Sequence, residues 1–230
     1  MSKKFDVIII GAGAAGMMSA IEAGKRGRKV LLVDHSKKIG EKIRISGGGR
    51  CNFTNIHTNP SKFLSQNPKF VKSALSQYTQ NDFINLMNKY EIKFHEKKLG
   101  QLFCDHSAQQ IVEMLLKECE LANVSLKKDF KVTDINQDED QYIVKTTDEV
   151  YSSQSLIIAT GGLSVPKIGA TSFGYEIAKK FDLDVLETLP ALVPLTFNEK
   201  ILEMCKELTG LSVEAIVSFN KVLFQEGMLF

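Results

Sequence analysis

Runs of apolar residues predict the strands of a parallel sheet at the start of the chain and again far along it. Residues 5–10, 29–34 and 156–159 are apolar or β-branched at nearly every position. Strands with this pattern are typical of a parallel sheet that is covered on both faces. Residues 14–26 predict a helix, and Gly27 is suited to its C-terminal end. The chain therefore begins with a β-α-β unit, and the same sheet resumes more than 100 residues later.

Between these two parts the pattern changes to helical periodicity. Residues 59–122 contain a single glycine, and Asn67-Pro68 and Ser107 are suited to helix starts. The first helix would place four large side chains on one face, which indicates core packing. These side chains are Phe83, Leu86, Met87 and Tyr90. We therefore expect a helical excursion that leaves the sheet.

The second half of the chain predicts further short strands. Residues 124–150 indicate strands joined by a polar turn at 138–140, and residues 211–219 and 222–230 indicate two more. We place a domain boundary near Phe197, after which a β-rich domain begins. The chain ends on apolar residues without a turn signal, so we expect it to stop inside a strand.

Composition narrows the possible classes of protein. The chain has 230 residues, of which 43% are hydrophobic, and 29 Lys and Arg residues nearly balance 27 Asp and Glu residues. Because these charges are interspersed and form no basic stripe, nucleic-acid binding is not favoured. No apolar run approaches the roughly 18 residues that span a bilayer, so we expect no membrane partner.

The cysteines and the N-terminus favour the cytoplasm. The four cysteines form no C-x-x-C pair and have no regularly spaced histidines near them, which argues against a zinc site and fits a reducing compartment. The apolar stretch at residues 7–21 resembles a signal peptide, but glycines at fixed offsets interrupt it. We interpret this stretch as a strand followed by a phosphate-binding turn.

Glycines cluster near the N-terminus and form a nucleotide-binding motif there. Nine of the sixteen glycines lie in the first fifty residues, and residues 11–16 match G-x-G-x-x-G. Gly11 permits a tight turn, Gly13 leaves room for a pyrophosphate, and Gly16 lets the helix approach the strand. Asp34 ends the second strand, where its carboxylate can accept hydrogen bonds from both ribose hydroxyls and disfavours a 2′-phosphate. We therefore predict a dinucleotide site that does not take NADP.

The dinucleotide is more consistent with FAD than with NAD. In an NAD dehydrogenase further β-α repeats usually follow at once, whereas this chain leaves the sheet after Asp34 for a glycine-rich loop. Three consecutive glycines in residues 39–55 can direct their N–H groups at an anion. Lys42, Arg44 or Arg50 can neutralise a diphosphate or a reduced flavin. A flexible linker is the alternative interpretation.

No catalytic side chain stands out. An arginine and backbone amides beside Cys51 would lower the pKa of its thiol. The loop has no second cysteine, so we exclude dithiol chemistry and favour packing near the cofactor over a nucleophilic role. His35 follows the ribose-binding Asp34 and is expected only to line the adenine end, whereas His57, His95 and His106 stand alone. We therefore name no general acid or base. The flavin would carry the redox chemistry itself.

Several separated blocks of the chain form a recognisable set. They are residues 11–16, the run Ser-Gly-Gly-Gly-Arg-Cys-Asn-Phe-Thr-Asn at 46–55, residues 99–103 and 159–164, Pro166, and residues 169–171, 174–175 and 190–195. Together they resemble a bacterial family of FAD-dependent oxidoreductases, the aminoacetone-oxidase-like and bile-acid dienone-reductase-like flavoproteins. The run at 46–55 is the most specific block. Members of this family continue well past 230 residues, so the chain corresponds to somewhat more than their first half.

The resemblance implies a Rossmann-like α/β fold. A two-dinucleotide FAD-binding domain would occupy residues 1–197, with a helical excursion at about 59–122, and an inserted β-rich domain would begin at 198–230. The resemblance also implies which residues line FAD, with Val132 beside adenine through its backbone. They are Gly11, Gly13, Ala14, Ala15, Gly16, Asp34, Glu41, Lys42, Ser46, Gly47, Gly48, Gly49, Arg50, Cys51, Asn52, Val132, Thr160, Gly161 and Gly162.

These features predict an FAD-dependent oxidoreductase that transfers hydride between the flavin and a small organic substrate or a nicotinamide. Its partners would be a small-molecule substrate and NAD(P)H as a candidate electron donor, without nucleic acid or membrane. The alternative is a truncated FAD-binding fragment without turnover of its own. A third hypothesis, an RNA-modifying flavoprotein with a similar N-terminal turn, is disfavoured by the near-neutral charge.

Overall fold

The computed structural model describes residues 2–189 and 196–230. The chain divides into two compact units, residues 1–185 and residues 186–230. The predicted domain boundary near Phe197 lies within the second unit and stays a prediction. The family-like positions at 190–195 lie outside the described residues.

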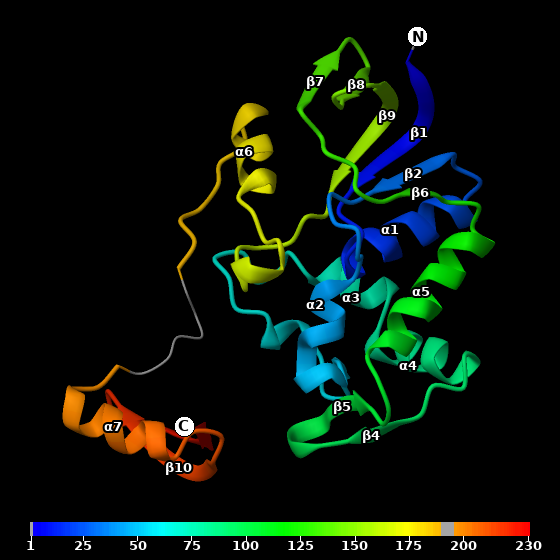
Figure 1. Cartoon of the computed structure of the whole chain (residues 1–230). Helices are drawn as coiled ribbons and strands as arrows, with labels where there is room; N and C mark the ends of the chain where they lie inside the picture. Colours follow the sequence, from blue (N-terminus) through cyan, green and yellow to red (C-terminus); the bar gives the residue numbers. More distant parts are fainter. Residues whose placement is uncertain (1, 190–195) are drawn as a thin grey trace. The chain divides into compact units, whose positions relative to one another are not determined.

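A six-stranded sheet forms the centre of the first unit (Figure 1). Its strand order is β6-β2-β1-β9-β8-β7, and β6, β2, β1 and β9 are parallel, whereas β8 and β7 are antiparallel. The strands are β1 (Lys3–Ile10), β2 (Val30–Val33), β6 (Ser125–Lys127), β7 (Asp134–Asp138), β8 (Gln141–Lys145) and β9 (Val150–Ile158). Ile8 lies between Leu31 and Leu156, so the strand that returns late in the chain pairs directly with the first one. The resumed sheet predicted from the apolar runs is thus present.

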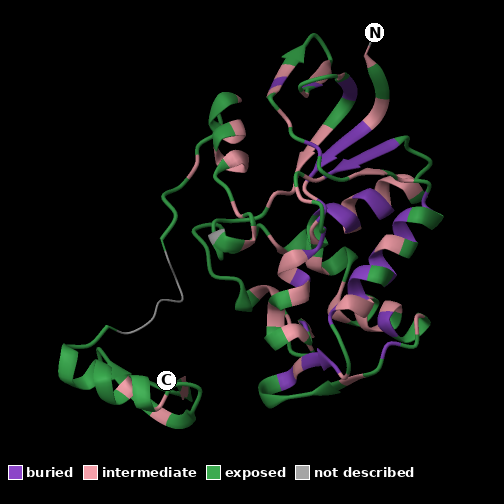
Figure 2. Cartoon of the chain, viewed as in Figure 1, coloured by how far each residue is buried: buried purple, intermediate pink, exposed green. Residues whose placement is uncertain are grey.

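Two helices cover one face of this sheet. They are α1 (Ala14–Lys25) and α5 (Gln109–Leu121), which pack against each other and bury Met17, Ile21, Ile111 and Leu115 (Figure 2). On the other face Ile10, Val33, Phe130 and Tyr151 form a second cluster. Helix α6 (Phe173–Lys180) packs against that cluster through half-buried side chains. Burial on both faces explains why the central strands are apolar at successive positions.

The excursion between β2 and β6 combines helices with a small antiparallel sheet. Its sheet has the order β3-β5-β4 and was not predicted, because three- and four-residue strands leave too short a pattern to detect. Met87 is fully buried, as expected for the apolar stripe, and Thr79 forms a capping box with Asp82 at the helix start. The elements are α2 (Glu41–Ile45), η1 (Ser46–Gly49), β3 (Asn52–Asn55), η2 (Pro60–Lys62), α3 (Lys72–Gln77), α4 (Gln80–Lys89), β4 (Phe94–Glu96), η3 (Lys98–Gly100) and β5 (Gln101–Cys104).

The residues of the second unit that the structure describes form one helix and one hairpin. Helix α7 (Glu199–Glu207) precedes β10 (Ser212–Phe219) and β11 (Val222–Leu229), which pair antiparallel across a two-residue turn at Asn220-Lys221. The two strands agree with the sequence prediction.

A short one-turn helix, η4 (Pro166–Ile168), lies before α6 in the first unit. Nowhere in the described ranges is a helix long and apolar enough to cross a membrane.

Candidate functional site

The turn between β1 and α1 has the geometry of a phosphate-binding loop. Gly11 has φ +106°, and a Cβ added there would lie 2.5 Å from the carbonyl oxygen of Ala159. A Cβ on Gly16 would lie 1.8 Å from the carbonyl oxygen of Gly11. A Cβ on Gly13 would meet no protein atom within 4 Å. Two glycines therefore permit backbone contact, and the third borders open space at the start of α1.

Asp34 connects this turn to the end of β2. Its Oδ2 accepts a hydrogen bond from the backbone N–H of Ala12 at 2.7 Å, and its Oδ1 accepts one from Ser36 at 2.8 Å. Nδ1 of His35 lies 3.6 Å from Oδ1. Each carboxylate oxygen has two lone pairs, so both oxygens can still accept a bond from a ligand hydroxyl.

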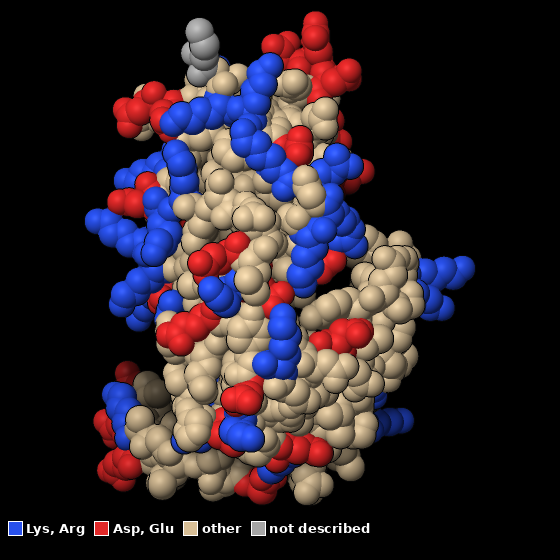
Figure 3. Space-filling view, turned by 90° about the vertical axis from the view of Figure 1, so that its right-hand side faces the viewer, with Lys and Arg blue, Asp and Glu red and all other residues tan. Residues whose placement is uncertain are grey.

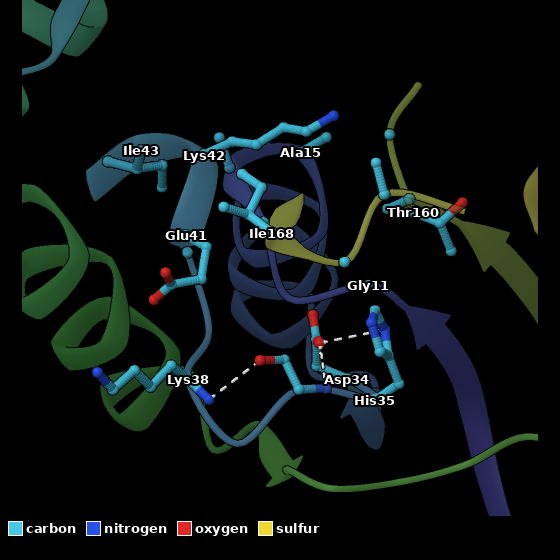
Figure 4. A pocket seen from close by; sticks show the side chains of 18 of the residues that line it. Gly11, Ala15, Asp34, His35, Lys38, Glu41, Lys42, Ile43, Thr160 and Ile168 are labelled. Atoms are coloured by element: carbon cyan, nitrogen blue, oxygen red, sulfur yellow. Dashed lines mark hydrogen bonds and ion pairs between the residues drawn. The ribbon is translucent and has the colours of Figure 1, made fainter. Parts of the chain in front are cut away.

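A cavity of about 730 Å³ opens beside the turn. Figure 4 shows that Asp34, Glu41 and Thr160 reach it from three different segments of the first unit. Thirteen of the nineteen residues predicted to line FAD also line this cavity. They are Gly11, Gly13, Ala14, Ala15, Asp34, Glu41, Lys42, Ser46, Cys51, Asn52, Val132, Thr160 and Gly161.

Six of the predicted residues do not line the cavity. Gly16 faces the strand, and Gly162 accepts a hydrogen bond from Lys42 Nζ at 2.8 Å through its carbonyl. The other four are Gly47, Gly48, Gly49 and Arg50. The three glycines of this group all have positive φ, and Arg50 is exposed and donates to the carbonyl oxygen of Asp105 at 2.7 Å. In this structure the triglycine is a tight backbone turn behind the cavity wall.

Helix α2 supplies two charged side chains with different surroundings. Lys42 Nζ donates to Gly162 and, at 2.9 Å, to Ser164 Oγ, and so connects α2 to the segment after β9. Glu41 Oε1 is buried without a hydrogen-bond donor, although Arg44 Nε lies 3.3 Å away as an ion pair. A buried carboxylate oxygen without a donor is costly, and its place in the cavity wall suits a ligand hydroxyl.

Several cavity residues were missed in the sequence. Phe53, Phe83, Ile111 and Leu115 form an apolar wall, and all except Phe53 belong to helices α4 and α5. Phe83 was interpreted as core packing, and it does pack on the core while it also borders the cavity. Helical periodicity identifies the buried face of a helix but does not distinguish core from cavity wall. The remaining missed residues include Ser36, Lys38, Phe130, Lys131 and residues 168–171 and 173.

Burial raises the pKa of the Cys51 thiol above its ordinary value, and a hydrogen bond with Ser46 opposes this only in part. The thiol is therefore protonated at neutral pH, although the neighbouring arginine and amides were expected to lower its pKa. Arg50 points away to Asp105 and does not offset the desolvation. The structure agrees with Cys51 as a packed residue of the cavity wall.

Comparison with known proteins assigns the chain to a family. Residues 5–222 match the model described as HI0933-like protein Rossmann domain. The chain belongs to the HI0933-like family. The Rossmann-like fold class predicted from the sequence is confirmed, as is FAD as the cofactor of this flavoprotein oxidoreductase fold. The predicted membership of an FAD oxidoreductase family is confirmed at that level.

Three curated relatives are similar along much of this HI0933-like chain. The ribosomal RNA dihydrouridine synthase of Escherichia coli (strain K12) is 51% identical over 229 residues, which cover 99% of the chain and 57% of the relative. The ribosomal RNA dihydrouridine synthase of Haemophilus influenzae is 43% identical, and the match covers 97% of the chain and 58% of the relative. The 3-dehydro-bile acid delta(4,6)-reductase of Clostridium scindens is 25% identical, and the match covers 81% of the chain and 46% of the relative. The HI0933-like chain thus spans little more than half the length of the first two relatives, and the match covers less than half of the third.

Among solved structures, the 3-ketosteroid-delta4-(5alpha)-dehydrogenase of Rhodococcus jostii RHA1 is similar with a TM-score of 0.50. Its sequence identity is 13%, and the match covers 70% of this chain and 46% of that one. At this identity the likeness concerns the fold alone.

The expectation of a small-molecule partner without nucleic acid is contradicted, because two relatives are named for ribosomal RNA. The expectation rested on a net charge of +2 for the whole chain. That value averages two unlike units: residues 1–185 carry 26 basic and 21 acidic residues, whereas residues 186–230 carry three and six. The net charge of the whole chain therefore conceals that basic residues outnumber acidic residues in the first unit.

Proposed function

We propose that this chain is the FAD-binding part of a flavoenzyme that reduces a uridine base of ribosomal RNA to dihydrouridine. The observation that carries this proposal is the 51% identity to a ribosomal RNA dihydrouridine synthase across 99% of the chain. An enzyme of this kind would act in the cytoplasm, where ribosomal RNA of bacteria is made and assembled.

The chain's own residues would hold FAD along the cavity. The N–H groups at the start of α1 would bind the pyrophosphate beside Gly13, and Asp34 would accept hydrogen bonds from the adenosine ribose. Val132 would border adenine. Glu41, whose buried oxygen has no donor, would accept a hydrogen bond from another hydroxyl of the cofactor.

The region of the cavity that would hold the flavin is lined by Ser46, Cys51, Asn52 and Thr160. The apolar side chains of Phe53 and Phe83 border this region and would exclude water from it. Lys42, which is bound to Gly162 and Ser164, would fix the segment after β9 against α2. The six predicted residues outside the wall would act through this backbone framework.

The proposed reaction is the reduction of a carbon–carbon double bond conjugated to a carbonyl. In uracil, C5=C6 is conjugated to the C4 carbonyl, so hydride adds to C6 and a proton from solvent adds to C5. Reduced FAD would supply the hydride, and a reduced nicotinamide would supply the two electrons and be oxidised. The bile-acid reductase among the relatives is also named for reducing double bonds, which supports this reaction class.

Nucleoside analysis tests the proposal. Full-length protein would be incubated with FAD, reduced nicotinamide and ribosomal RNA transcribed in vitro, either free or assembled into particles. We expect digestion and mass spectrometry to reveal a uridine heavier by two hydrogens, only when both the protein and the nicotinamide are present. Protein that binds FAD but modifies neither form of the RNA would refute the proposal and favour an FAD-binding fragment without turnover.

A further inference from the structure

A run of ten residues in the first unit is exposed throughout, although it contains large apolar side chains. Residues 61–70, which begin within η2 and end just before α3, are all exposed (Figure 2). Leu64 is 94% exposed, Phe70 is 79% exposed and Phe63 is 43% exposed. Such side chains are costly to leave in water unless a partner covers them. We refer to residues 61–72, which include the basic residue at the start of α3, as the exposed loop.

The exposed loop lies in a stretch of the sequence without acidic residues. Residues 42–81 contain six Lys and Arg residues and no Asp or Glu. Lys62, Lys69 and Lys72 belong to the loop and are exposed, and none of them forms an ion pair with a residue that the structure describes. In contrast, Lys25 and Lys89 pair with Glu118. The loop therefore presents three uncompensated positive charges among exposed apolar side chains.

Both ends of the exposed loop lead to the cavity wall. Phe53 precedes it in β3, and Phe83 follows it in α4, and both phenylalanines line the cavity. Their ring centroids are 5.9 Å apart, so the two phenylalanine rings also contact each other. The loop is the cyan segment between β3 and α3 in Figure 1. Phe53 lies eight residues before the loop and Phe83 eleven residues after it, so the segments on both sides of the loop continue to the cavity wall.

The chemistry of the exposed loop matches single-stranded RNA. Aromatic side chains stack on unpaired bases, and lysines bind the phosphates between them. Reduction of a base also requires that the base leave its stack, which an adjacent stacking surface favours. Elsewhere, on the face shown in Figure 3, basic and acidic side chains are interspersed. A membrane surface fits less well, because helix α3 has only six residues and offers no long amphipathic face.

We propose that the exposed loop binds the single-stranded ribosomal RNA next to the target uridine. Phe70 stacks on an unpaired base, and Lys62, Lys69 and Lys72 contact the phosphates. This inference rests on the proposed function, because it names the surface that delivers the RNA substrate to the cavity.

RNA binding by loop variants of the full-length protein tests the inference. The probe is a fluorescent single-stranded fragment of ribosomal RNA, and its anisotropy is measured over a series of salt concentrations. For the triple change of Lys62, Lys69 and Lys72 to Gln, we expect affinity to fall at least tenfold and the salt slope to fall by about 2. For Phe70→Ala, we expect affinity to fall roughly five- to fiftyfold with an unchanged slope.

A charge-matched control removes three exposed lysines elsewhere. The triple change of Lys117, Lys145 and Lys206 to Gln lowers the net charge equally and is expected to leave the salt slope within about 0.5 of the parent's. FAD binding, measured by flavin fluorescence, is expected to be the same in all variants, which shows that each one folds. An equal loss of RNA affinity in control and loop variants would overturn the inference, as would loop variants that bind like the parent.

The outcomes separate this inference from the proposed function. If the parent forms dihydrouridine and the loop variants do so equally well, the inference fails and the function stands. If the parent binds RNA through the loop but forms no dihydrouridine with a reduced nicotinamide, the function fails and the binding surface stands. A parent protein that binds phosphatidylserine vesicles but no RNA overturns the inference in favour of a membrane surface.

Discussion

The backbone N–H of Ala12 donates a hydrogen bond to Asp34 Oδ2 across 2.7 Å. Residue 12 lies in the turn after β1, and Asp34 follows β2, so this bond fixes the phosphate turn against the neighbouring strand. The same carboxylate also holds the N–H of Ser36. Asp34 therefore shapes the site and offers its free lone pairs to a ligand, two roles that substitution can separate.

Asp34→Asn is expected to weaken FAD binding about 10- to 100-fold. The amide keeps one acceptor oxygen, loses the negative charge, and points N–H groups at a backbone donor or a ribose hydroxyl. Isothermal titration of the apoprotein with FAD measures the change. Asp6→Asn is the matched control, because Asp6 also accepts from a backbone N–H, that of Lys29 at 2.7 Å, but does not line the cavity. Equal FAD affinity in the parent and the Asp34 variant would contradict the assigned role.

Gly13→Ala is expected to leave the apoprotein folded and to lower FAD affinity by about tenfold or more. Its φ of −84° suits alanine, and the added methyl meets no protein atom within 4 Å. The methyl would occupy the space that we assign to the pyrophosphate. Thermal unfolding without FAD and titration with FAD measure the two effects separately. If FAD binds this variant normally, the pyrophosphate lies elsewhere.

Gly16→Ala, unlike Gly13→Ala, is expected to lower the stability of the apoprotein itself. A Cβ at Gly16 would lie 1.8 Å from the carbonyl oxygen of Gly11, so α1 must move away from β1. Overpacking of this kind costs about 1–3 kcal/mol or more of unfolding free energy. Urea unfolding of the apoprotein measures the loss. A variant as stable as the parent would show that the helix can shift without cost.

The turn chemistry of Gly11, Gly13 and Asp34 could be predicted because each residue acts through local backbone geometry. A glycine needed for a close approach or a carboxylate at a strand end leaves its mark within about thirty residues. The resumed sheet was predictable for a related reason, since Ile157 and its neighbours repeat the apolar pattern of the first strand. In these cases sequence position determines spatial position.

Other features of the site depend on contacts between distant segments. The triglycine was expected to face the cofactor, but Arg50 is held by the Asp105 carbonyl and Gly47 packs against Phe103. These partners lie more than fifty residues away in the sequence, so no local pattern could indicate that they hold the loop. Phe83 likewise belongs to an apolar stripe whether it meets core or cavity. Tertiary packing decides such cases.

Glu118→Gln is expected to destabilise the fold at neutral pH. It is also expected to weaken the dependence of the unfolding free energy on pH under acidic conditions. Burial alone would raise the pKa of this carboxyl, but hydrogen bonds from Lys89, Tyr90 and Lys25 outweigh burial and lower the pKa to about 2. A lowered pKa contributes stability that is present above the unfolded value near 4.5 and is lost as the pH falls toward 2. We expect a loss of about 2–3 kcal/mol at pH 7 that shrinks between about pH 4.5 and 2.

Glu113→Gln is the control for this measurement. Glu113 lies on the same helix, α5, but is exposed. Within the described part of the chain it accepts a hydrogen bond only from Gln109 Nε2, at 2.9 Å. Urea unfolding at several pH values is expected to place this variant within about 0.5 kcal/mol of the parent. If the gap between parent and Glu118→Gln stayed constant from pH 7 to 2, the Glu118 carboxylate would not be the group that titrates.

Cys51 is expected to react slowly with iodoacetamide at pH 7.5, far more slowly than Cys205. Burial holds the pKa of the Cys51 thiol above its ordinary value, so little thiolate is present, and the cavity wall shields the sulfur. Cys205 is only half-buried and serves as the internal reference. Peptide mass spectrometry of timed samples measures both rates. Because the pKa of the Cys51 thiol is raised, its thiolate fraction stays small through neutral pH. The Cys51 rate should therefore still be rising with pH above the ordinary thiol pKa, and bound FAD should slow it further. Rapid labelling of Cys51 at neutral pH would instead identify an activated thiolate and return a nucleophilic role to this residue.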